Sequence, residues 1–261
     1  MPRQTCNDPN RLPEKLIECL STATRRVCAL TGAGVSAESG IPTFREAHTG
    51  LWARYDPMEL ASPEAFEREP ATVWDWYQWR RKLIAEARPN PGHEALAALE
   101  EHVRELVLIT QNVDGFHALA GSTGVLELHG NIQRNICSRS RRPIDADWIE
   151  RHREAHPPPS PHHPDGLARP DVVWFGEALD AGILDAAFAA AQDCEVMIVA
   201  GTSGAVQPAA SLPVAAARAG ATLIDINPET NELTRFAHWH LAGSSAAWLP
   251  ALVAALANGR S

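Results

Sequence analysis

The stretch TGAGVSAESGIPTFR, residues 31–45, follows the apolar run VCAL at 27–30 and contains the pattern Gly-x-Gly-x-x-Ala. Gly32 permits a tight turn, Gly34 lets backbone come close to a pyrophosphate, and Ala37 lets a helix pack closely. A strand followed by this turn predicts a dinucleotide site, although glycines after a strand also form ordinary turns. Gly40 and Pro42 are expected to end the helix almost at once. An ordinary NAD dehydrogenase is therefore disfavoured, because its first helix runs on into a second strand.

Apolar runs alternate with helical patterns along the rest of the chain. Strands are predicted at 27–30, 106–110, 125–128, 172–174, 196–200 and 222–226, and helices at 12–24, 63–87, 92–103, 181–192, 209–219 and 246–257. This order predicts an α/β fold with a parallel sheet. The segment 131–170 contains PPPSPHHP at 157–164 and breaks the alternation, so we expect an inserted loop or small lobe there.

Composition limits the classes of function. The 261 residues are 45% hydrophobic and carry a formal charge of −9, which argues against a nucleic-acid partner. The sequence contains neither an apolar run of membrane-spanning length nor a signal-peptide pattern at its start, so no membrane partner and a cytoplasmic location are expected. Five cysteines, at 6, 19, 28, 137 and 194, form no C-x-x-C pair and are expected to be reduced.

Six segments together resemble the motif set of the sirtuins, the NAD-dependent protein-lysine deacylases. They are GAGVSAESGIPTFR, TQNVDGFH (110–117), LELHGN (126–131), RPDVVWFGE (169–177), GTSGAVQP (201–208) and INPE (226–229). They span nearly the whole chain in the family's order. The resemblance implies one catalytic domain over 1–261. Its large Rossmann-like lobe, with helices on both faces of the sheet, would take in 12–45, 90–134 and 171–261, and the inserted small lobe 46–89 and 135–170.

The implied reaction removes an acyl group from a protein lysine, releasing nicotinamide and O-acyl-ADP-ribose, with NAD+ as co-substrate. His129 matches the family's general base, and an imidazole suits that task because its ordinary pKa leaves it neutral at cellular pH. Asn112 and Asp114 would join it as catalytic residues that hold the nicotinamide carboxamide. Asp114 could instead cap the following helix, and His129 could be a surface histidine.

The resemblance also implies a set of NAD-binding residues. They come from the loops that follow the predicted strands, where ligands bind in parallel sheets. The set is Gly32, Ala33, Gly34, Glu38, Thr43, Phe44, Arg45, Gln111, Asn112, Asp114, Gly201, Thr202, Ser203, Asn227, Glu229 and Ser245.

The acylated protein or peptide substrate would pair with the segment VWFGE. Its residues are Val173, Trp174, Phe175, Gly176 and Glu177, and one of the two aromatic rings is alternatively a core residue. Tyr77 and Arg80 stand three residues apart in a predicted helix and share a face. This pair is similar to that of the sirtuin branch that removes succinyl and malonyl groups, whose carboxylate a guanidinium can bind. The alternative is an amphipathic helix in which Tyr77 packs and Arg80 extends to solvent. Because Arg81 and Lys82 lie alongside, charge alone does not single out Arg80.

This sequence lacks most of the zinc ligands that are usual in the family. Sirtuins hold zinc with two C-x-x-C pairs, whereas this chain has Cys137-Ser-Arg-Ser140 and then His162 and His163 without a second cysteine pair. A hydroxyl is a poor zinc ligand, so we expect no metal.

Two other functions stay open beside deacylation. The same pocket could serve protein ADP-ribosyl transfer, or the chain could bind NAD without catalysis. The sequence does not indicate an oligomeric state.

Overall fold

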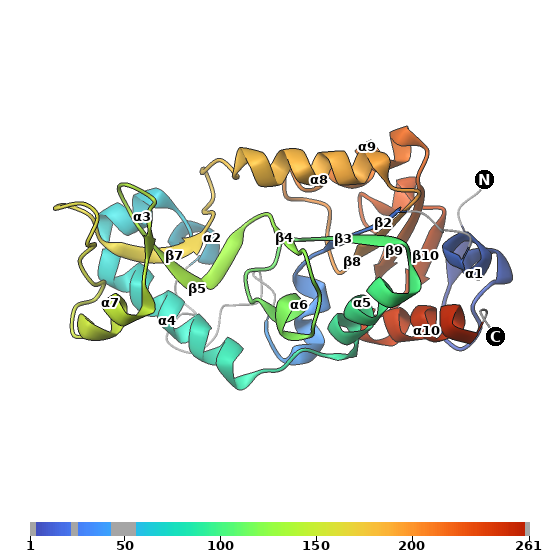
Figure 1. Cartoon of the computed structure of the whole chain (residues 1–261), viewed down its shortest axis with the longest axis horizontal. Coiled ribbons are helices and arrows are strands. Elements are labelled where there is room, and N and C mark those ends of the chain that lie inside the picture. The colour runs from blue at the N-terminus through green and yellow to red at the C-terminus, as the bar shows by residue number, and fades with distance from the viewer. Residues whose placement is uncertain (1–3, 22–25, 43–55, 259–261) are drawn as a thin grey trace.

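The computed structural model describes residues 4–21, 26–42 and 56–258, and shows a large lobe and a small lobe side by side (Figure 1). The large lobe is built on a seven-stranded sheet in the order β1-β10-β9-β8-β2-β3-β4. All neighbouring strands in it run parallel. Its strands are β1 (Gln4–Cys6), β2 (Arg26–Thr31), β3 (Glu105–Thr110), β4 (Leu126–Glu127), β8 (Val196–Ala200), β9 (Thr222–Asn227) and β10 (Trp239–Ala242).

The strand order reverses between β2 and β8. From β2 the chain continues to β3 and β4 on one side, and from β8 it continues to β9 and β10 on the other. The register pairs Thr31 of β2 with both Thr110 of β3 and Ala200 of β8, so these three strands end at the same level. Ligands bind at such a reversal, outside the carboxyl ends of the strands. The fold therefore places the loops after β2, β3 and β8 around one switch point of the sheet, which is called the crevice below.

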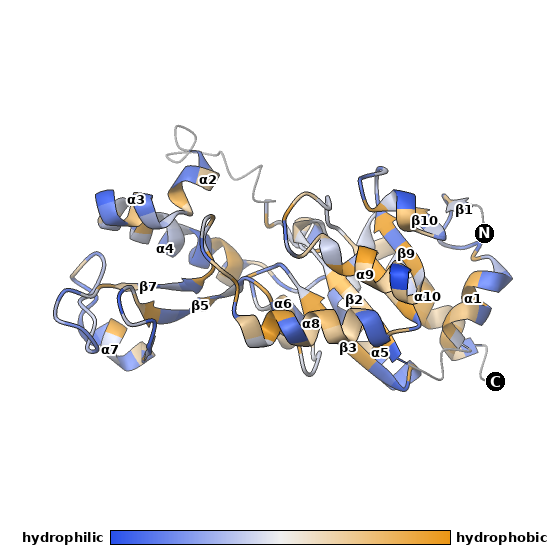
Figure 2. Cartoon of the chain, turned by 90° about the horizontal axis from the view of Figure 1, so that it is seen from above, coloured by the Kyte–Doolittle hydropathy of each residue, from blue (hydrophilic) through white to orange (hydrophobic). Residues whose placement is uncertain are grey.

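Helices cover both faces of the large sheet (Figure 1). The helices α1 (Glu14–Ser21), α5 (Pro91–His102) and α10 (Ser245–Asn258) pack on one face, and α8 (Ala181–Asp193) and α9 (Ser211–Ala219) on the other. The central strands β2, β8 and β9 are mostly buried, and Figure 2 shows their hydrophobic residues in orange. Within the described ranges, no helix combines the length and the apolar character needed to cross a bilayer.

The small lobe contains an antiparallel sheet in the order β6-β5-β7. Its elements are β5 (Gly130–Cys137), β6 (Pro143–Ile144), β7 (Ala168–Val172), α2 (Pro57–Leu60), α3 (Pro63–Arg68), α4 (Pro70–Glu86) and α7 (Ala146–Arg151). Trp76, Tyr77 and Ile132 are fully buried in its core. The chain enters β5 through Gly130, whose φ is +77°; a Cβ there would lie 2.1 Å from the Asp171 carbonyl oxygen. Only glycine fits this turn.

The predicted fold class is confirmed, and three predicted elements differ. The strand at 172–174 is not part of the parallel sheet, because β7 ends at Val172 and pairs antiparallel with β5. The single helix at 63–87 is two helices, since the chain leaves helical geometry at Glu69 immediately before Pro70. Segment 131–170 is more regular than expected, because it carries most of β5 together with β6 and α7. The lobe boundaries proposed from the sequence stay a prediction.

Candidate functional site

Two glycine-containing loops meet at the centre of the crevice. The Gly34 N–H donates to the Gly201 carbonyl at 2.8 Å, and the Gly32 N–H donates to the Ala200 carbonyl at 3.0 Å. Gly201 has φ +61°, and a Cβ on it would lie 2.4 Å from the Val35 nitrogen. The two backbones lie too close together for a Cβ, so these positions require glycine whether or not a ligand is bound. After the turn, the 3-10 helices η1 (Ala33–Val35) and η2 (Ala37–Ser39) end at Gly40, as the sequence predicted.

Polar side chains after β3 join these two loops. Gln111 donates from Nε2 to the Thr202 hydroxyl at 2.9 Å, which ties the loop after β3 to the loop after β8. Asn112 is buried and donates from Nδ2 to the Gly32 carbonyl at 3.1 Å and to the Ser36 hydroxyl at 3.2 Å. The structure thus brings three sequence-predicted segments into one hydrogen-bonded unit.

Asp114 lies at the end of a buried polar chain. Its Oδ1 accepts the Phe116 N–H at 2.9 Å, at the start of α6 (Phe116–Leu119), and its Oδ2 accepts the Ser36 hydroxyl at 2.8 Å. Desolvation raises the pKa of this carboxyl, opposed by hydrogen bonds from Phe116 and Ser36 and by the charge of Arg80. Asp114 thus accepts the first N–H of α6, although the N-cap residue is Gly115, and it also lies at the crevice.

Ser36 and His93 belong to the hydrogen-bonded network that ends at Asp114, and the sequence had not indicated either residue. His93 Nδ1 accepts the Asn90 N–H at 3.2 Å, so Nε2 carries the proton toward the Ser36 hydroxyl 3.3 Å away. Burial lowers the pKa of His93 to about 4 and keeps the ring neutral. The signal was a capping box formed by Asn90 and His93, which places the histidine in the first turn of α5.

His129 follows β4 and lies half-buried at the crevice. Its Nδ1 lies 3.0 Å from the Gln111 carbonyl oxygen. Because a carbonyl only accepts, Nδ1 carries the proton and Nε2 keeps its lone pair. Burial lowers the pKa of His129, opposed by the bond to Gln111, so the ring is neutral at pH 7. The ring is thus held in the tautomer that a general base requires.

The remaining predicted NAD-binding residues take different positions. Glu38 accepts the Ala246 N–H at 3.2 Å, next to Ser245, which is buried at the start of α10. Asn227 is buried and bonded to Asp225, whereas Ser203 and Glu229 are exposed after β8 and β9. Ala33 is half-buried in η1. Thr43, Phe44 and Arg45 lie outside the described residues. Glycine loops, hydroxyls and amides at the carboxyl ends of parallel strands fit a dinucleotide.

The predicted peptide segment continues from the end of β7. The Val173 N–H donates to the His129 carbonyl at 3.0 Å, which joins this segment to the candidate base. Trp174 is buried, whereas Phe175 is 39% exposed and Gly176 is exposed. Of the two aromatic rings, Trp174 is therefore the core residue. Glu177 receives two hydrogen bonds from the buried Arg169 guanidinium, at 2.7 and 2.8 Å.

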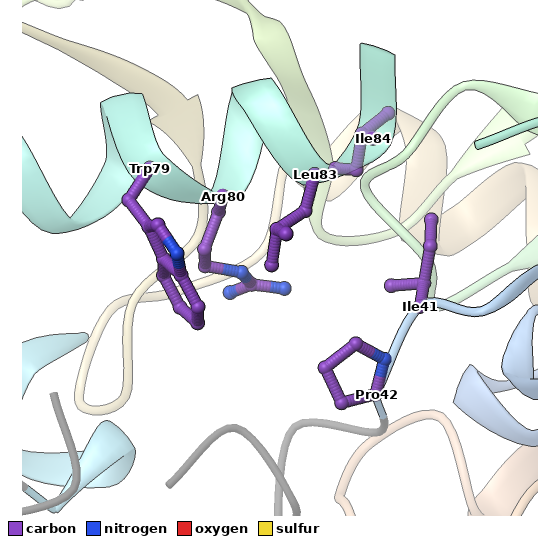
Figure 3. A pocket seen from close by; sticks show the side chains of 6 residues that line it. All are labelled: Ile41, Pro42, Trp79, Arg80, Leu83 and Ile84. Atoms are coloured by element: carbon purple, nitrogen blue, oxygen red, sulfur yellow. The ribbon is translucent and has the colours of Figure 1, made fainter. Parts of the chain in front are cut away.

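Tyr77 and Arg80 lie on one face of α4, with the Arg80 guanidinium carbon 5.9 Å from the centre of the Tyr77 ring. Arg80 lines a small pocket with Trp79, Leu83 and Ile84, facing Ile41 and Pro42 (Figure 3). Tyr77 is fully buried beside it and is not part of the pocket wall. Desolvation lowers the pKa of Arg80, opposed by Tyr77 and Asp114.

The structure separates Arg80 from its neighbour Arg81. Arg81 donates to the Ile132 carbonyl at 2.6 Å and to Asn135 Oδ1 at 2.8 Å, so it joins α4 to β5. Lys82 is exposed. Charge pattern alone left these three cations equivalent, and the packing of α4 distinguishes them.

The residues at the family's zinc position do not fit a zinc ion. Cys137, Ser160 and His163 surround Gly166, and His163 Nδ1 accepts the Asp165 N–H at 3.1 Å. Against the desolvation that raises it, hydrogen bonds from Ser140 and Ser160 lower the pKa of the Cys137 thiol to about 7. Within the described part of the chain, no three His, Cys, Asp or Glu side chains come together as a metal site. One thiol with two hydroxyls is a poor zinc donor set.

Sequence comparisons show which known proteins this chain is similar to. The Sir2 family model matches residues 32–208. An NAD-dependent protein deacylase of Aeropyrum pernix is 53% identical over 80% of this chain and 83% of its own length. An NAD-dependent protein deacylase of Methylococcus capsulatus is 43% identical over 95% of this chain and 98% of its own length.

Solved structures match over the whole fold as well. A Sir2 homologue in complex with NAD has a TM-score of 0.86 at 41% identity and covers 96% of each chain. A Sir2 homologue mutant with 2'-O-acetyl ADP-ribose has a TM-score of 0.85 at 42% identity, covering 96% of this chain and 98% of that one. A Sir2 mutant with a p53 peptide and NAD has a TM-score of 0.80 at 29% identity, covering 95% of this chain and 99% of that one.

Proposed function

The chain belongs to the Sir2 family and is an NAD-dependent protein deacylase, and we propose that it prefers succinyl- and malonyl-lysine to acetyl-lysine. The observation that carries this preference is the position of Arg80. Its guanidinium points into the pocket between Trp79 and Leu83 (Figure 3). Arg80 lies on the same face of α4 as Tyr77. A half-buried cation beside a phenol favours an acyl group that ends in a carboxylate. An acetyl group has no carboxylate to offer that cation.

We assign the general base to His129. Its Nδ1 proton is committed to the Gln111 carbonyl, which leaves Nε2 to accept a proton at the crevice. NAD+, when bound, supplies the electrophilic ribose carbon and nicotinamide as leaving group. Asn112 and Asp114 would orient the carboxamide end. The Gly32–Gly34 and Gly201–Ser203 loops would hold the phosphates, and Asn227, Glu229 and Ser245 the adenosine end.

The acylated protein would bind along residues 173–177. Phe175 and Gly176 are exposed there, and the His129 carbonyl receives the Val173 N–H. A peptide that adds as an extended strand is held chiefly through its main chain, so little sequence preference is expected. The Sir2 structure with a p53 peptide supports a peptide partner. The free state of all five cysteines supports a cytoplasmic location.

Mass spectrometry of matched succinyl-, malonyl- and acetyl-lysine peptides incubated with enzyme and NAD+ tests both proposals. The His129→Ala variant should lose at least about 100-fold in turnover of every peptide. The Arg80→Met variant should lose roughly 10- to 100-fold in kcat/KM for the acidic acyl groups only. Lys82→Met is the matched control, because it removes an exposed cation from the same helix and should change neither rate.

Each alternative gives a different product pattern. An acetyl preference in the wild type would overturn the acyl assignment. ADP-ribose attached to protein without loss of the acyl group would indicate a transferase, and NAD binding without nicotinamide release would indicate a binding module.

A further inference from the structure

Among the described residues, the Tyr77 hydroxyl accepts one hydrogen bond and donates none. The Trp174 indole Nε1 donates to the Tyr77 hydroxyl oxygen at 2.9 Å. An indole N–H can only donate, so the phenol oxygen is the acceptor and its own proton must point elsewhere. Among the residues that the structure describes, none accepts that proton. Buried polar groups are nearly always paired, so this proton is available to a partner beyond the described residues.

Trp174 is itself fixed on three sides. The Arg169 guanidinium carbon lies 3.2 Å from the centre of the Trp174 ring, and the Phe66 ring centre lies 5.2 Å from it. The Trp174 backbone N–H donates to Glu177 Oε2 at 2.9 Å. Because Glu177 also pairs with Arg169, backbone and ring are held by the same ion pair. The direction of the indole N–H is therefore set by the small lobe.

Tyr77 and Arg80 then present complementary groups. The Arg80 guanidinium carbon lies 5.1 Å from the centre of the Trp76 ring and 5.9 Å from that of Tyr77, and Arg80 lines the neighbouring pocket. A carboxylate that pairs with a guanidinium has lone pairs left to accept an O–H. Burial raises the pKa of Tyr77, so the phenol keeps its proton at neutral pH.

We propose that Trp174 is a positioning residue for acyl specificity. Its indole N–H occupies the acceptor side of the Tyr77 hydroxyl, so that the phenol proton is aimed at the distal carboxylate of an acyl group bound by Arg80. This inference rests on the acidic-acyl preference proposed above. Trp174 acts through Tyr77 and does not touch the reacting atoms.

The test is a double-mutant cycle of Trp174→Phe and Tyr77→Phe, assayed with succinyl- and acetyl-lysine peptides. Trp174→Phe keeps an aromatic ring on Arg169 and removes only the indole and its N–H. The ratio of kcat/KM for succinyl over acetyl should fall by about three- to tenfold, through KM of the succinyl peptide. Tyr77→Phe should lower the ratio at least as much, and Trp174→Phe should add nothing in its background.

Trp148→Phe is the matched control. Trp148 lies in α7 of the same lobe and donates from Nε1 to the Pro159 carbonyl at 2.8 Å, so this change also deletes one indole hydrogen bond. It should leave the succinyl-to-acetyl ratio unchanged. Thermal denaturation of all variants shows which of them fold as the wild type does.

The outcomes separate the two proposals. Equal losses for both peptides in Trp174→Phe, or an effect that persists in the Tyr77→Phe background, would show a merely structural tryptophan while the acyl preference stands. A wild type that does not prefer the succinyl peptide would overturn the acyl preference, and the positioning role with it.

Discussion

At the residue scale, the state of His129 is set by one backbone contact and by burial. The Gln111 carbonyl fixes the proton on Nδ1, and desolvation lowers the pKa of the ring from 6.5. Both effects favour the neutral ring with Nε2 available. The sequence placed His129 after a strand, but the tautomer depends on a carbonyl eighteen residues earlier in the chain.

The pH dependence of deacylation should report this shift. A base whose pKa is lowered stays neutral to lower pH, so kcat/KM should fall toward acid pH with a midpoint below 6.5. Measurement of kcat/KM between pH 5 and 8 checks this, with circular dichroism at each pH to confirm folding. That control matters because burial also lowers the pKa of His117 to about 3. A midpoint at or above 6.5 would contradict the prediction.

Gly201 offers a second prediction at this scale. Gly201→Ala places a Cβ 2.4 Å from the Val35 nitrogen at φ +61°, whereas Gly124→Ala has φ +65° and meets nothing within 4 Å. Gly124→Ala should cost about 1 kcal/mol from backbone strain alone. Gly201→Ala should cost a further 1–3 kcal/mol, roughly, from overpacking. It should also weaken NAD binding. Urea denaturation and NAD titration of both variants test this, and equal losses would contradict it.

At the element scale, the ion pair of Arg169 and Glu177 holds β7 against the segment that follows it. Arg169 is 4% exposed, donates twice to Glu177, and also donates to the Val172 carbonyl at 2.8 Å. Removal of a partner from such a buried pair is costly because the other charge is left uncompensated. We infer that this pair stabilises residues 172–177 against the rest of the small lobe.

Arg169→Lys should therefore be far from conservative. A lysine keeps the charge but loses the bidentate geometry and the flat contact with Trp174. We expect a loss of about 2–3 kcal/mol in the free energy of unfolding and a raised KM for every peptide. Arg134→Lys is the control, since its pairs with Glu127 and Asp171 are half-exposed and should matter by less than about 1 kcal/mol. Similar losses in both variants would refute the role.

At the scale of the whole molecule, two lobes with separate cores share one site. The proposed NAD-binding edge lies in the large lobe, and Tyr77, Arg80 and Trp174 of the proposed acyl site lie in the small lobe. Contacts such as the hydrogen bond from Val173 to His129 connect them. A change that destabilises the small lobe should therefore weaken peptide and acyl binding more than it weakens NAD binding.

Metal removal tests how the small lobe is held. Cys137, Ser140 and Ser160 form a hydrogen-bonded cluster at the family's zinc position, so purified protein should contain far less than one zinc per chain. Prolonged treatment with EDTA should leave Tm and deacylase activity unchanged. Elemental analysis with thermal denaturation measures both, with a relative that carries both C-x-x-C pairs as positive control. One tightly bound zinc per chain, or a lowered Tm, would contradict the prediction.

The sequence by itself determined the parallel sheet, its alternation with helices and the loops at its carboxyl edge. These follow from local hydrophobic periodicity and from turn residues, which act over a few positions. Only the tertiary structure decided that Arg80 rather than Arg81 faces a pocket, that His93 stands behind Asp114, and that Trp174 directs the Tyr77 hydroxyl. Each of these joins residues far apart in the chain, and no local pattern encodes the distance between two such side chains.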